Sequence, residues 1–357
     1  MLKRAITIIC ALVLILTGCA TAGEPTWEEQ YNLGLRYLYE GNYEEAIIAF
    51  TAAIEIEPKR TEAYIGLADT YIGMEEPERA QGVLMEGIEI TGEDIMREKL
   101  AELQYEMGEE NLDRGKFEEA AENFRDSIEN NPKREDAHLG LADALMEMGE
   151  LEKAIEALQD AMDALDKPSD ALKDWLDELE ELKDALDTLM GFLSAGDLDA
   201  LQGDDVKGFL DVLNKYMDMC YDGERLVRDY TGVGFKMLME SFIYYGDLVH
   251  GEPNGTGDGI YLAGPYDYYS GGWSGGKPNG EGTEITIGDD YTILDIGTYV
   301  DGKGNGSFSR TETYSDGTAV YQMTVENGEV TSGKNPVSNS ASYIQYAARV
   351  FVYGFDD

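Results

Sequence analysis

The stretch GKFEEAAENFRDSIENNPKR, Gly115 to Arg134, has two near copies elsewhere in the chain. GNYEEAIIAFTAAIEIEPKR lies at Gly41 to Arg60, and GELEKAIEALQDAMDALDKP lies at Gly149 to Pro168, 34 residues after the first stretch. Apolar residues recur at steps of three and four within each copy, which is typical of amphipathic helices. A repeat of this length predicts stacked helix pairs, each of which buries its neighbour's apolar face.

Aligned copies place small residues in two columns and a bulky residue in a third. The small residues are Gly34, Ala68, Gly108 and Ala142 in one column, and Ala46, Ala80, Ala120 and Ala154 in the other. The bulky residues are Phe50, Leu84, Phe124 and Leu158. This pattern resembles the tetratricopeptide repeat, and four repeats would cover residues 27–168. The second repeat has Gly92 where proline is expected and extra residues at 95–100, so we expect a longer helix or a kink there.

The resemblance implies a groove lined by the first helix of each repeat. Its columns hold Glu28, Tyr31, Leu35, Tyr39, Glu62, Ile65, Asp69, Ile72, Glu102, Tyr105, Glu109, Asp113, Asp136, Leu139, Asp143 and Glu147. Relatives that grip a peptide's terminal carboxylate use Lys, Arg and Asn in this groove, and those residues are absent from the matching positions. An acidic groove with aromatic residues favours a basic peptide as partner. Alternatively, the groove is acidic only because the whole chain is.

The chain of 357 residues has a formal net charge of -45. Residues 20–190 hold 46 of its 72 acidic side chains but only 15 of its 27 basic ones. Such a surface repels phosphate backbones and anionic lipid headgroups, so we expect no nucleic-acid partner.

Residues 169–230 are expected to cap and brace the repeats. Leucines recur at steps of three and four from Leu172 to Leu193, which predicts an amphipathic helix that covers the last repeat. The same apolar stripe could instead serve a partner helix. A second helix is expected over residues 204–221.

Glycine, tyrosine and threonine dominate after residue 230, and apolar residues alternate as they do in strands. YYGDLVHGEPNGTG at Tyr244 to Gly257 matches YSGGWSGGKPNGEG at Tyr269 to Gly282, and a shorter copy follows at Gly297 to Gly306. These segments resemble MORN repeats, which implies antiparallel hairpins over residues 231–332 with glycines in the turns. Residues 333–357 form a C-terminal segment.

Two segments of this half imitate ligand-binding loops. Gly271, Gly276 and Lys277 have the spacing of a phosphate-binding loop, but Pro278 stands where Ser or Thr is needed and a strand pattern follows. DGKGNGSFSRTE at Asp301 to Glu312 imitates a calcium-binding loop, but Lys303 occupies a ligand position. We expect hairpin turns at both places, and therefore no nucleotide and no metal.

The N-terminus has the pattern of an export and lipidation signal, although an ordinary uncleaved anchor would look similar. Lys3 and Arg4 precede an apolar run from Ala5 to Leu16, and LTGC ends at Cys19. This resembles the lipobox of bacterial lipoproteins, which implies a signal peptide at 1–18, a lipid on Cys19, a linker at 19–26 and an extracytoplasmic, membrane-anchored protein. The remaining cysteine, Cys220, is expected to be a buried free thiol.

Together these features predict an α+β protein, in which a helical solenoid precedes an antiparallel hairpin sheet. The expected function is a noncatalytic adaptor on a bacterial membrane that needs no cofactor, with the acidic groove as its recognition surface. The alternative is a glycan- or cell-wall-binding module that uses exposed rings of the sheet, namely Tyr268, Tyr269 and Trp273. Those rings could instead pack on the next hairpin. Only two histidines, His138 and His250, are present, and no catalytic set is recognisable.

Overall fold

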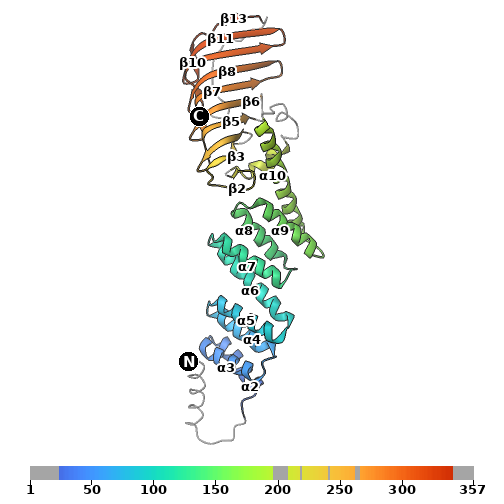
Figure 1. Ribbon diagram of the computed structural model, residues 1–357. Coiled ribbons are helices and arrows are strands. Elements are labelled where there is room, and N and C mark those ends of the chain that lie inside the picture. Colours follow the sequence, from blue (N-terminus) through green and yellow to red (C-terminus); the bar gives the residue numbers. More distant parts are fainter. Residues whose placement is uncertain (1–23, 196–207, 218, 240–241, 262–265, 341–357) are drawn as a thin grey trace. The chain divides into compact units, whose positions relative to one another are not determined.

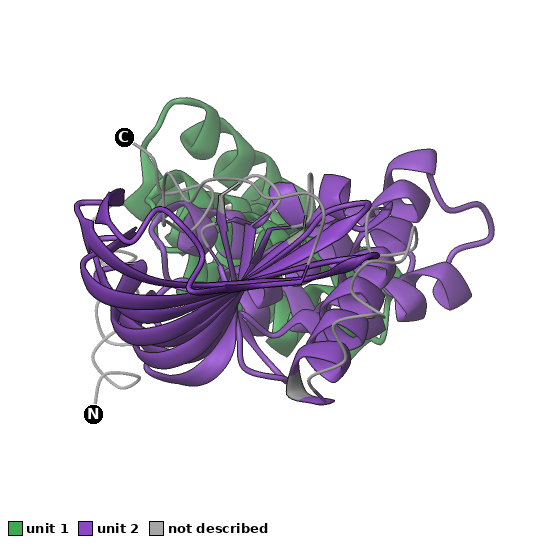
Figure 2. Cartoon of the chain, turned by 90° about the horizontal axis from the view of Figure 1, so that it is seen from above, with its two compact units in different colours: residues 1–107, 126–131 green, residues 108–125, 132–357 purple. Residues whose placement is uncertain are grey.

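The computed structural model describes residues 24–195, 208–217, 219–239, 242–261 and 266–340 (Figure 1). Two compact units are present, namely residues 1–107 with 126–131 (unit 1) and residues 108–125 with 132–357 (unit 2), as Figure 2 shows. Helices fill the first part of the chain and one antiparallel sheet follows, so the expected α+β class is confirmed.

The helices of the first part occur in pairs, at the residues that the sequence period predicts. They are α2 (Trp27–Tyr39), α3 (Tyr43–Ile56), α4 (Thr61–Gly73), α5 (Pro77–Thr91), α6 (Asp94–Asp113), α7 (Phe117–Asn130), α8 (Glu135–Glu147) and α9 (Leu151–Ala164). α6 has 20 residues where α4 and α8 have 13, so the extra residues 95–100 lengthen this helix. α5 ends at Thr91, and the left-handed backbone of the next residue, Gly92 (φ 70°), caps the helix.

Glycines make room for the aromatic rings between the helices. In unit 1 a β-carbon on Gly34 or Gly66 would lie 2.8 or 2.4 Å from the ring of Phe50. In unit 2 a β-carbon on Gly108 or Gly140 would lie 2.6 Å from the ring of Phe124. Both rings are fully buried. Gly34 and Gly108 belong to a small column of the sequence, whereas Gly66 and Gly140 lie outside both columns, and together they let neighbouring helices share one ring.

After the repeats comes α10 (Asp170–Ala195), followed by the short α12 (Leu210–Asn214). The seven leucines of the expected apolar stripe, Leu172 to Leu193, are all buried. α10 packs on α9 and α12. The stripe is thus covered by the chain itself, as expected for a capping helix.

The second part of unit 2 is a sheet in which the described residues form 13 strands (Figure 1). They are β1 (Cys220–Tyr221), β2 (Leu226–Val227), β3 (Gly232–Met239), β4 (Phe242–Val249), β5 (Glu252–Tyr261), β6 (Tyr266–Ser274), β7 (Lys277–Ile287), β8 (Tyr291–Val300), β9 (Lys303–Gly304), β10 (Gly306–Tyr314), β11 (Gly317–Glu326), β12 (Glu329–Ser332) and β13 (Ser338–Asn339). β3 to β8, then β10, β11 and β12, follow the chain order, so the sheet is a row of hairpins.

Four hairpins turn through two residues that both have positive φ, the geometry of type I′ turns. These turns are His250–Gly251, Gly275–Gly276, Asp301–Gly302 and Asn327–Gly328. The second explains the imitation of a phosphate loop, because β7 begins directly at Lys277. The third explains the imitation of a calcium loop. The fourth joins β11 to β12 at Asn327 and Gly328.

The expected helix over residues 204–221 is wrong at its C-terminal end. Cys220 and Tyr221 form β1, which pairs with β2 at Val227 and Leu226. β1 pairs with β3 as well. Pairing with two strands outweighs the local helical pattern. The sheet thus begins before residue 231, and β13 extends it beyond residue 332. Cys220 is a buried free thiol, as expected.

Candidate functional site

In unit 1 two of the expected groove acids, Glu28 and Glu62, are paired with Arg60. Its Nη1 lies 3.0 Å from Glu28 Oε1 and its Nη2 lies 3.3 Å from Glu62 Oε1. The guanidinium stacks 3.2 Å from the centroid of the Trp27 ring, which in turn stacks on Tyr31 at 4.6 Å. A backbone hydrogen bond and Arg60 lower the pKa of the Glu28 carboxyl. These acids therefore already have a cation.

A second pairing of this kind involves Lys99, which belongs to the extra residues 95–100. Its Nζ lies 3.4 Å from Asp69 Oδ1 and 3.5 Å from Glu102 Oε2. Partial burial lowers the pKa of the ammonium, but the two carboxylates outweigh this effect and hold the pKa above its ordinary value. The extra residues thus neutralise acids that the aligned columns leave without a counterion.

The aromatic residues of the expected groove in unit 1 have unlike surroundings. Tyr31 is half-buried between Trp27 and Phe50. Tyr105 is half-buried, whereas Tyr39 is 94% exposed. Tyr39 is therefore the ring of this set that a partner can reach most easily.

In unit 2 three groove acids lie together without a cation. Asp143 on α8 is near Glu109 on α6 and Glu147 on α8, and none of the three has an ion pair among the described residues. Packing removes part of the hydration of the Asp143 carboxyl, and this desolvation together with the two neighbouring carboxylates raises its pKa. Asp136 differs, since Arg134 Nε lies 3.0 Å from its Oδ1. We call Glu109, Asp143 and Glu147 the acidic cluster.

The sequence analysis did not predict that Arg60 and Lys99 would form ion pairs with the groove acids. For Arg60 a signal was present, because Pro-Lys-Arg ends both the first and the third repeat. Arg60 pairs with Glu62 and Arg134 pairs with Asp136, so an acid two residues after this motif binds its arginine. Lys99 had no such signal, since it lies in residues that have no counterpart in the other repeats.

The rings expected to form an exposed face of the sheet are mostly buried. Tyr269 is fully buried and Trp273 is 3% exposed, so the expected exposure is wrong for both. The physical reason is that glycines on neighbouring strands leave room for these rings: Trp273 lies against Tyr244 and Tyr269 at 4.8 and 5.4 Å. Its Nε1 donates to Gly257 O at 3.0 Å. Tyr268 is half-buried, and its hydroxyl lies 2.9 Å from Asp258 Oδ1.

The buried face of the sheet also carries a row of ionisable side chains. Glu284, Asp295 and Arg310 are cross-strand neighbours in register. Arg310 Nε and Nη2 bind Asp295 at 2.8 and 2.6 Å, and Tyr299 donates to Glu284 at 3.0 Å. Burial, together with Asp267 and Asp295, raises the pKa of Glu284 well above its ordinary value. All of these groups are less than 10% exposed, and they bind one another across the strands.

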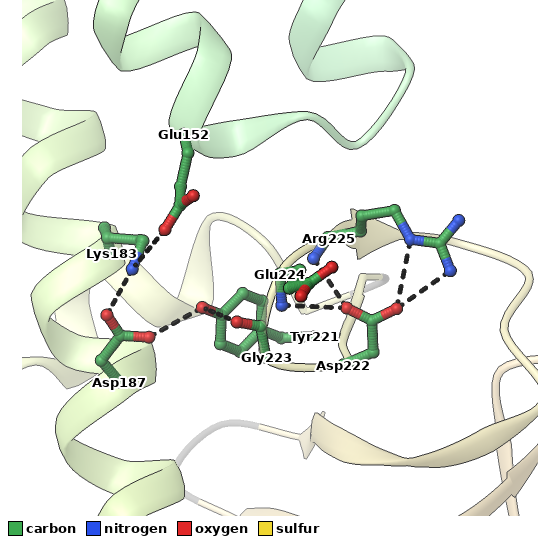
Figure 3. Close-up of polar contacts among 8 residues, drawn as sticks. All are labelled: Glu152, Lys183, Asp187, Tyr221, Asp222, Gly223, Glu224 and Arg225. Carbon is green, nitrogen blue, oxygen red and sulfur yellow. Dashed lines mark hydrogen bonds and ion pairs between the residues drawn. The ribbon is translucent and has the colours of Figure 1, made fainter.

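Polar contacts join the last repeat and α10 to the start of the sheet (Figure 3). Lys183 binds Glu152 at 3.1 Å and also Asp187, whose Oδ1 accepts from the Tyr221 hydroxyl at 2.7 Å. Burial lowers the pKa of Lys183, but its two carboxylate partners raise it further than burial lowers it. Leu226 N donates to Gly149 O at 2.9 Å, which ties β2 to the turn between α8 and α9.

Several expectations fall outside these contacts. Cys19, the expected lipidation site, lies outside the described residues, as does the expected signal segment at residues 1–18. Among the helices that are described, none is long and apolar enough to cross a membrane. No group of three His, Cys, Asp or Glu side chains in the described ranges is placed to hold a metal ion.

Comparison with known proteins finds similarity for the helical part of the chain. Residues 37–103 and 111–173 match the family model of the tetratricopeptide repeat. No curated protein matches the chain. A TPR repeats protein from Bacteroides fragilis NCTC 9343 is 21% identical, with 43% of this chain and 82% of that chain covered and a TM-score of 0.39.

Two further solved structures are similar at lower scores. MamA from Desulfovibrio magneticus RS-1 is 18% identical, with 54% of this chain and 94% of that chain covered and a TM-score of 0.31. The first TPR of Spaghetti (RPAP3), bound to an HSP90 peptide, is 17% identical, with 34% and 93% covered and a TM-score of 0.25. The family model matches the helix pairs described above. The helical part of this chain is therefore an array of tetratricopeptide repeats, and an antiparallel hairpin sheet follows it.

Proposed function

We propose that this protein is a noncatalytic adaptor, held on the outer face of a bacterial membrane by a lipid on Cys19, that binds a basic segment of a partner protein through its repeats. The acidic cluster is the observation that carries this proposal. Its three carboxylates have no cation in the described chain, whereas Asp69, which occupies the same column as Glu109 and Asp143, is paired with Lys99 in unit 1. A Lys or Arg of a partner would supply the missing charge.

This pairing pattern sharpens the kind of partner that we expect. Rim charges give specificity and association rate more than affinity, so exposed acids alone bind weakly. Leu139 lies on α8 one turn before Asp143 and is half-buried, which gives a basic residue an apolar neighbour beside the cluster. The segment that fits best therefore carries a Lys or Arg next to an apolar or aromatic side chain.

The hairpin sheet takes no direct part in this proposal. Its resemblance to MORN repeats suggests a contact module, but Tyr269 and Trp273 are buried and cannot stack on a sugar. Tyr268 remains as a half-exposed ring that is already bound to Asp258. A glycan-binding function is therefore less well supported than protein binding.

The test of partner binding is photo-crosslinking in cells that make the full-length chain. A photoreactive residue at position 139 should capture a distinct protein, and Glu109→Lys with Asp143→Lys should abolish that capture. The control pair Glu119→Lys with Glu156→Lys makes the same charge change at exposed positions on α7 and α9 of the same unit. Capture that is equally weakened by both pairs would contradict recognition by the cluster, because it would report net charge alone.

The lipid anchor has a separate test. Metabolic labelling with an alkyne-bearing fatty acid should mark the wild-type chain, and Cys19→Ser should lose both the label and membrane association. Labelled Cys19→Ser protein would contradict the anchor and leave the groove proposal standing.

A further inference from the structure

Unit 1 contains a cleft of about 620 Å³ that none of the groove residues lines. Residues of α5 form one wall, and the parts of α6 and α7 that belong to this unit form the rest. The cleft thus lies mainly against the second helices of two repeats, α5 and α7, and against the N-terminal part of α6, whereas the expected groove is formed by other residues of the first helices.

The extra residues 95–100 help to build this cleft. Arg97 and Leu100 both belong to these residues and both line it. Leu100 is 3% exposed and anchors the lengthened start of α6 in the core of unit 1. Next to it, Gln104 is buried and accepts a hydrogen bond from Asn130 at 3.0 Å, which fixes α7 to α6 at the bottom of the cleft. The cleft is therefore a built feature of this repeat pair.

The cleft combines an apolar patch with an acidic rim. Met85 is 54% exposed within it, beside Ile88, which is half-buried. Its lining also includes four carboxylates, those of Glu86, Glu89, Asp126 and Glu129. Arg97 is the one cationic residue of the lining, and Asp94 lies 4.0 Å from it. An exposed methionine in a concave, acidic site is typical of surfaces that take apolar side chains from cationic segments.

We propose that this cleft is a second protein-binding site and that it takes a cationic amphipathic helix of a partner. One or two apolar side chains of that helix would cover Met85 and Ile88, while flanking Lys or Arg would lie beside the rim carboxylates. We infer a helix because residues of both α5 and α7 line the cleft. The side-chain ridge of one helix packs into grooves on the surface of others. This site goes beyond the acidic cluster and does not depend on it.

The experiment measures binding of a fluorescein-labelled helical peptide of Leu and Lys to the full-length chain in mild detergent, by fluorescence anisotropy. The cleft variant is Met85→Lys with Glu89→Lys. Its matched control is Thr51→Lys with Glu55→Lys, the same columns one repeat earlier, where both residues are likewise exposed. Both variants change the net charge equally and leave buried residues in place, and circular dichroism checks that each one folds.

The cleft variant should weaken binding at least about tenfold, and the control should change it less than about twofold. A peptide with Ser in place of Leu should bind weakly to the wild-type chain, because it offers no apolar side chain. Equal weakening by the cleft variant and its control would overturn the proposal, since attraction by net charge would then explain binding. Weakening by Glu109→Lys with Asp143→Lys alone would also overturn it and would place the peptide at the acidic cluster.

Discussion

The helical repeats and the hairpin sheet both bury aromatic rings against glycines, but they differ in the polar groups that they bury. In both, glycine makes room for a ring: Gly66 faces Phe50 in the helices, and Gly282 faces Tyr269 in the sheet, where an added β-carbon would meet the ring within 2.5 Å. The buried polar groups differ. Among the described helices they include no carboxylate and no arginine: Thr70 and Ser127, for example, bind backbone carbonyls at 2.7 and 2.6 Å.

In the sheet the buried polar groups are mostly charged or can become charged. Asp267, Glu284, Asp295, Arg310 and Glu312 are all less than 10% exposed. Antiparallel pairing places side chains of adjacent strands directly opposite one another, so these groups meet their partners across strands. The comparison teaches that the sheet, unlike the helices, depends on the protonation and pairing of its interior.

The largest effect is expected from Arg310→Leu. The change leaves Asp295 buried without its cation and removes the guanidinium that faces Glu312 at 4.0 Å. Breaking a buried ion pair on one side costs about 3–5 kcal/mol. Urea denaturation followed by Trp273 fluorescence, with Trp27→Phe and Trp175→Phe as background, measures this loss in the sheet.

Two controls decide whether the loss comes from the orphaned charge. Arg310→Leu with Asp295→Leu should recover much of the stability, because an apolar pair leaves no buried charge. Lowering the pH should also recover part of it in the single variant, since protonation neutralises the carboxylate. A single variant as unstable at low pH as at neutral pH would show that lost packing, and not charge, is the cause.

The second effect concerns the turn where the helical repeats meet the sheet. Gly149 and Gly115 occupy the same position of successive repeats and have φ of 79° and 70°. A β-carbon on Gly149 would lie 2.6 Å from Leu226 O and 2.5 Å from Val227 Cγ1, whereas on Gly115 it would meet nothing closer than 4.0 Å. Gly115→Ala should cost about 1 kcal/mol through its left-handed backbone alone.

Gly149→Ala should cost about 2–4 kcal/mol, because the clash adds to the backbone strain and displaces the bond from Leu226 N. Thermal unfolding of both variants gives the difference. Equal losses would contradict a tight contact between the turn and β2.

The helical part was largely predictable from the sequence, because its period fixes both the helix pairs and their shared rings. Gly34, Gly108, Phe50 and Phe124 stand in columns that are visible without a structure, whereas the roles of Gly66 and Gly140 beside these rings were not predicted. The hairpin turns were predictable for the same reason, since glycine recurs at each of them. Which groove acids have a counterion was not predictable, because Arg60 and Lys99 bind acids on other helices.

The sheet interior shows a second limit of sequence reasoning. Glu284, Asp295 and Arg310 alternate with outward-facing residues on three different strands, so only the register shows that they are neighbours. The strand at Cys220 and Tyr221 escaped prediction in the same way, because its partners lie elsewhere in the chain. Local sequence patterns therefore predict the repeats. They do not predict which strands pair, or which side chains become neighbours across those strands.

A smaller effect of opposite sign is expected from Glu284→Gln. The pKa of Glu284 is raised in the folded state, mainly by burial, so folding takes up a proton at this residue. Its contribution to stability is therefore full below the unfolded-state pKa and is lost as the pH rises through the folded-state pKa. Glutamine keeps a neutral group that can accept from Tyr299, so the variant should match the wild type in acid and be more stable at higher pH.

Denaturant titrations across a pH series measure this difference. Glu281→Gln, an exposed acid on the same strand, is the control and should leave the pH profile unchanged. Parallel pH profiles of wild type and Glu284→Gln would contradict proton uptake at this residue.

The smallest effect is expected from Asp143→Asn in the acidic cluster. Asp143 is an acid of the helical part whose pKa is raised, as that of Glu284 is in the sheet. Desolvation, Glu109 and Glu147 raise the pKa of Asp143. Its charged form is therefore destabilising, and stability falls as the pH rises through the folded-state pKa. Because this side chain is exposed, solvent screens the repulsion, and the gain from asparagine at neutral pH should stay below about 0.5 kcal/mol and shrink in high salt. A gain as large as that of Glu284→Gln, or one insensitive to salt, would mean that the cluster is buried like the row in the sheet. The helices could then no longer be distinguished from the sheet by the absence of buried carboxylates.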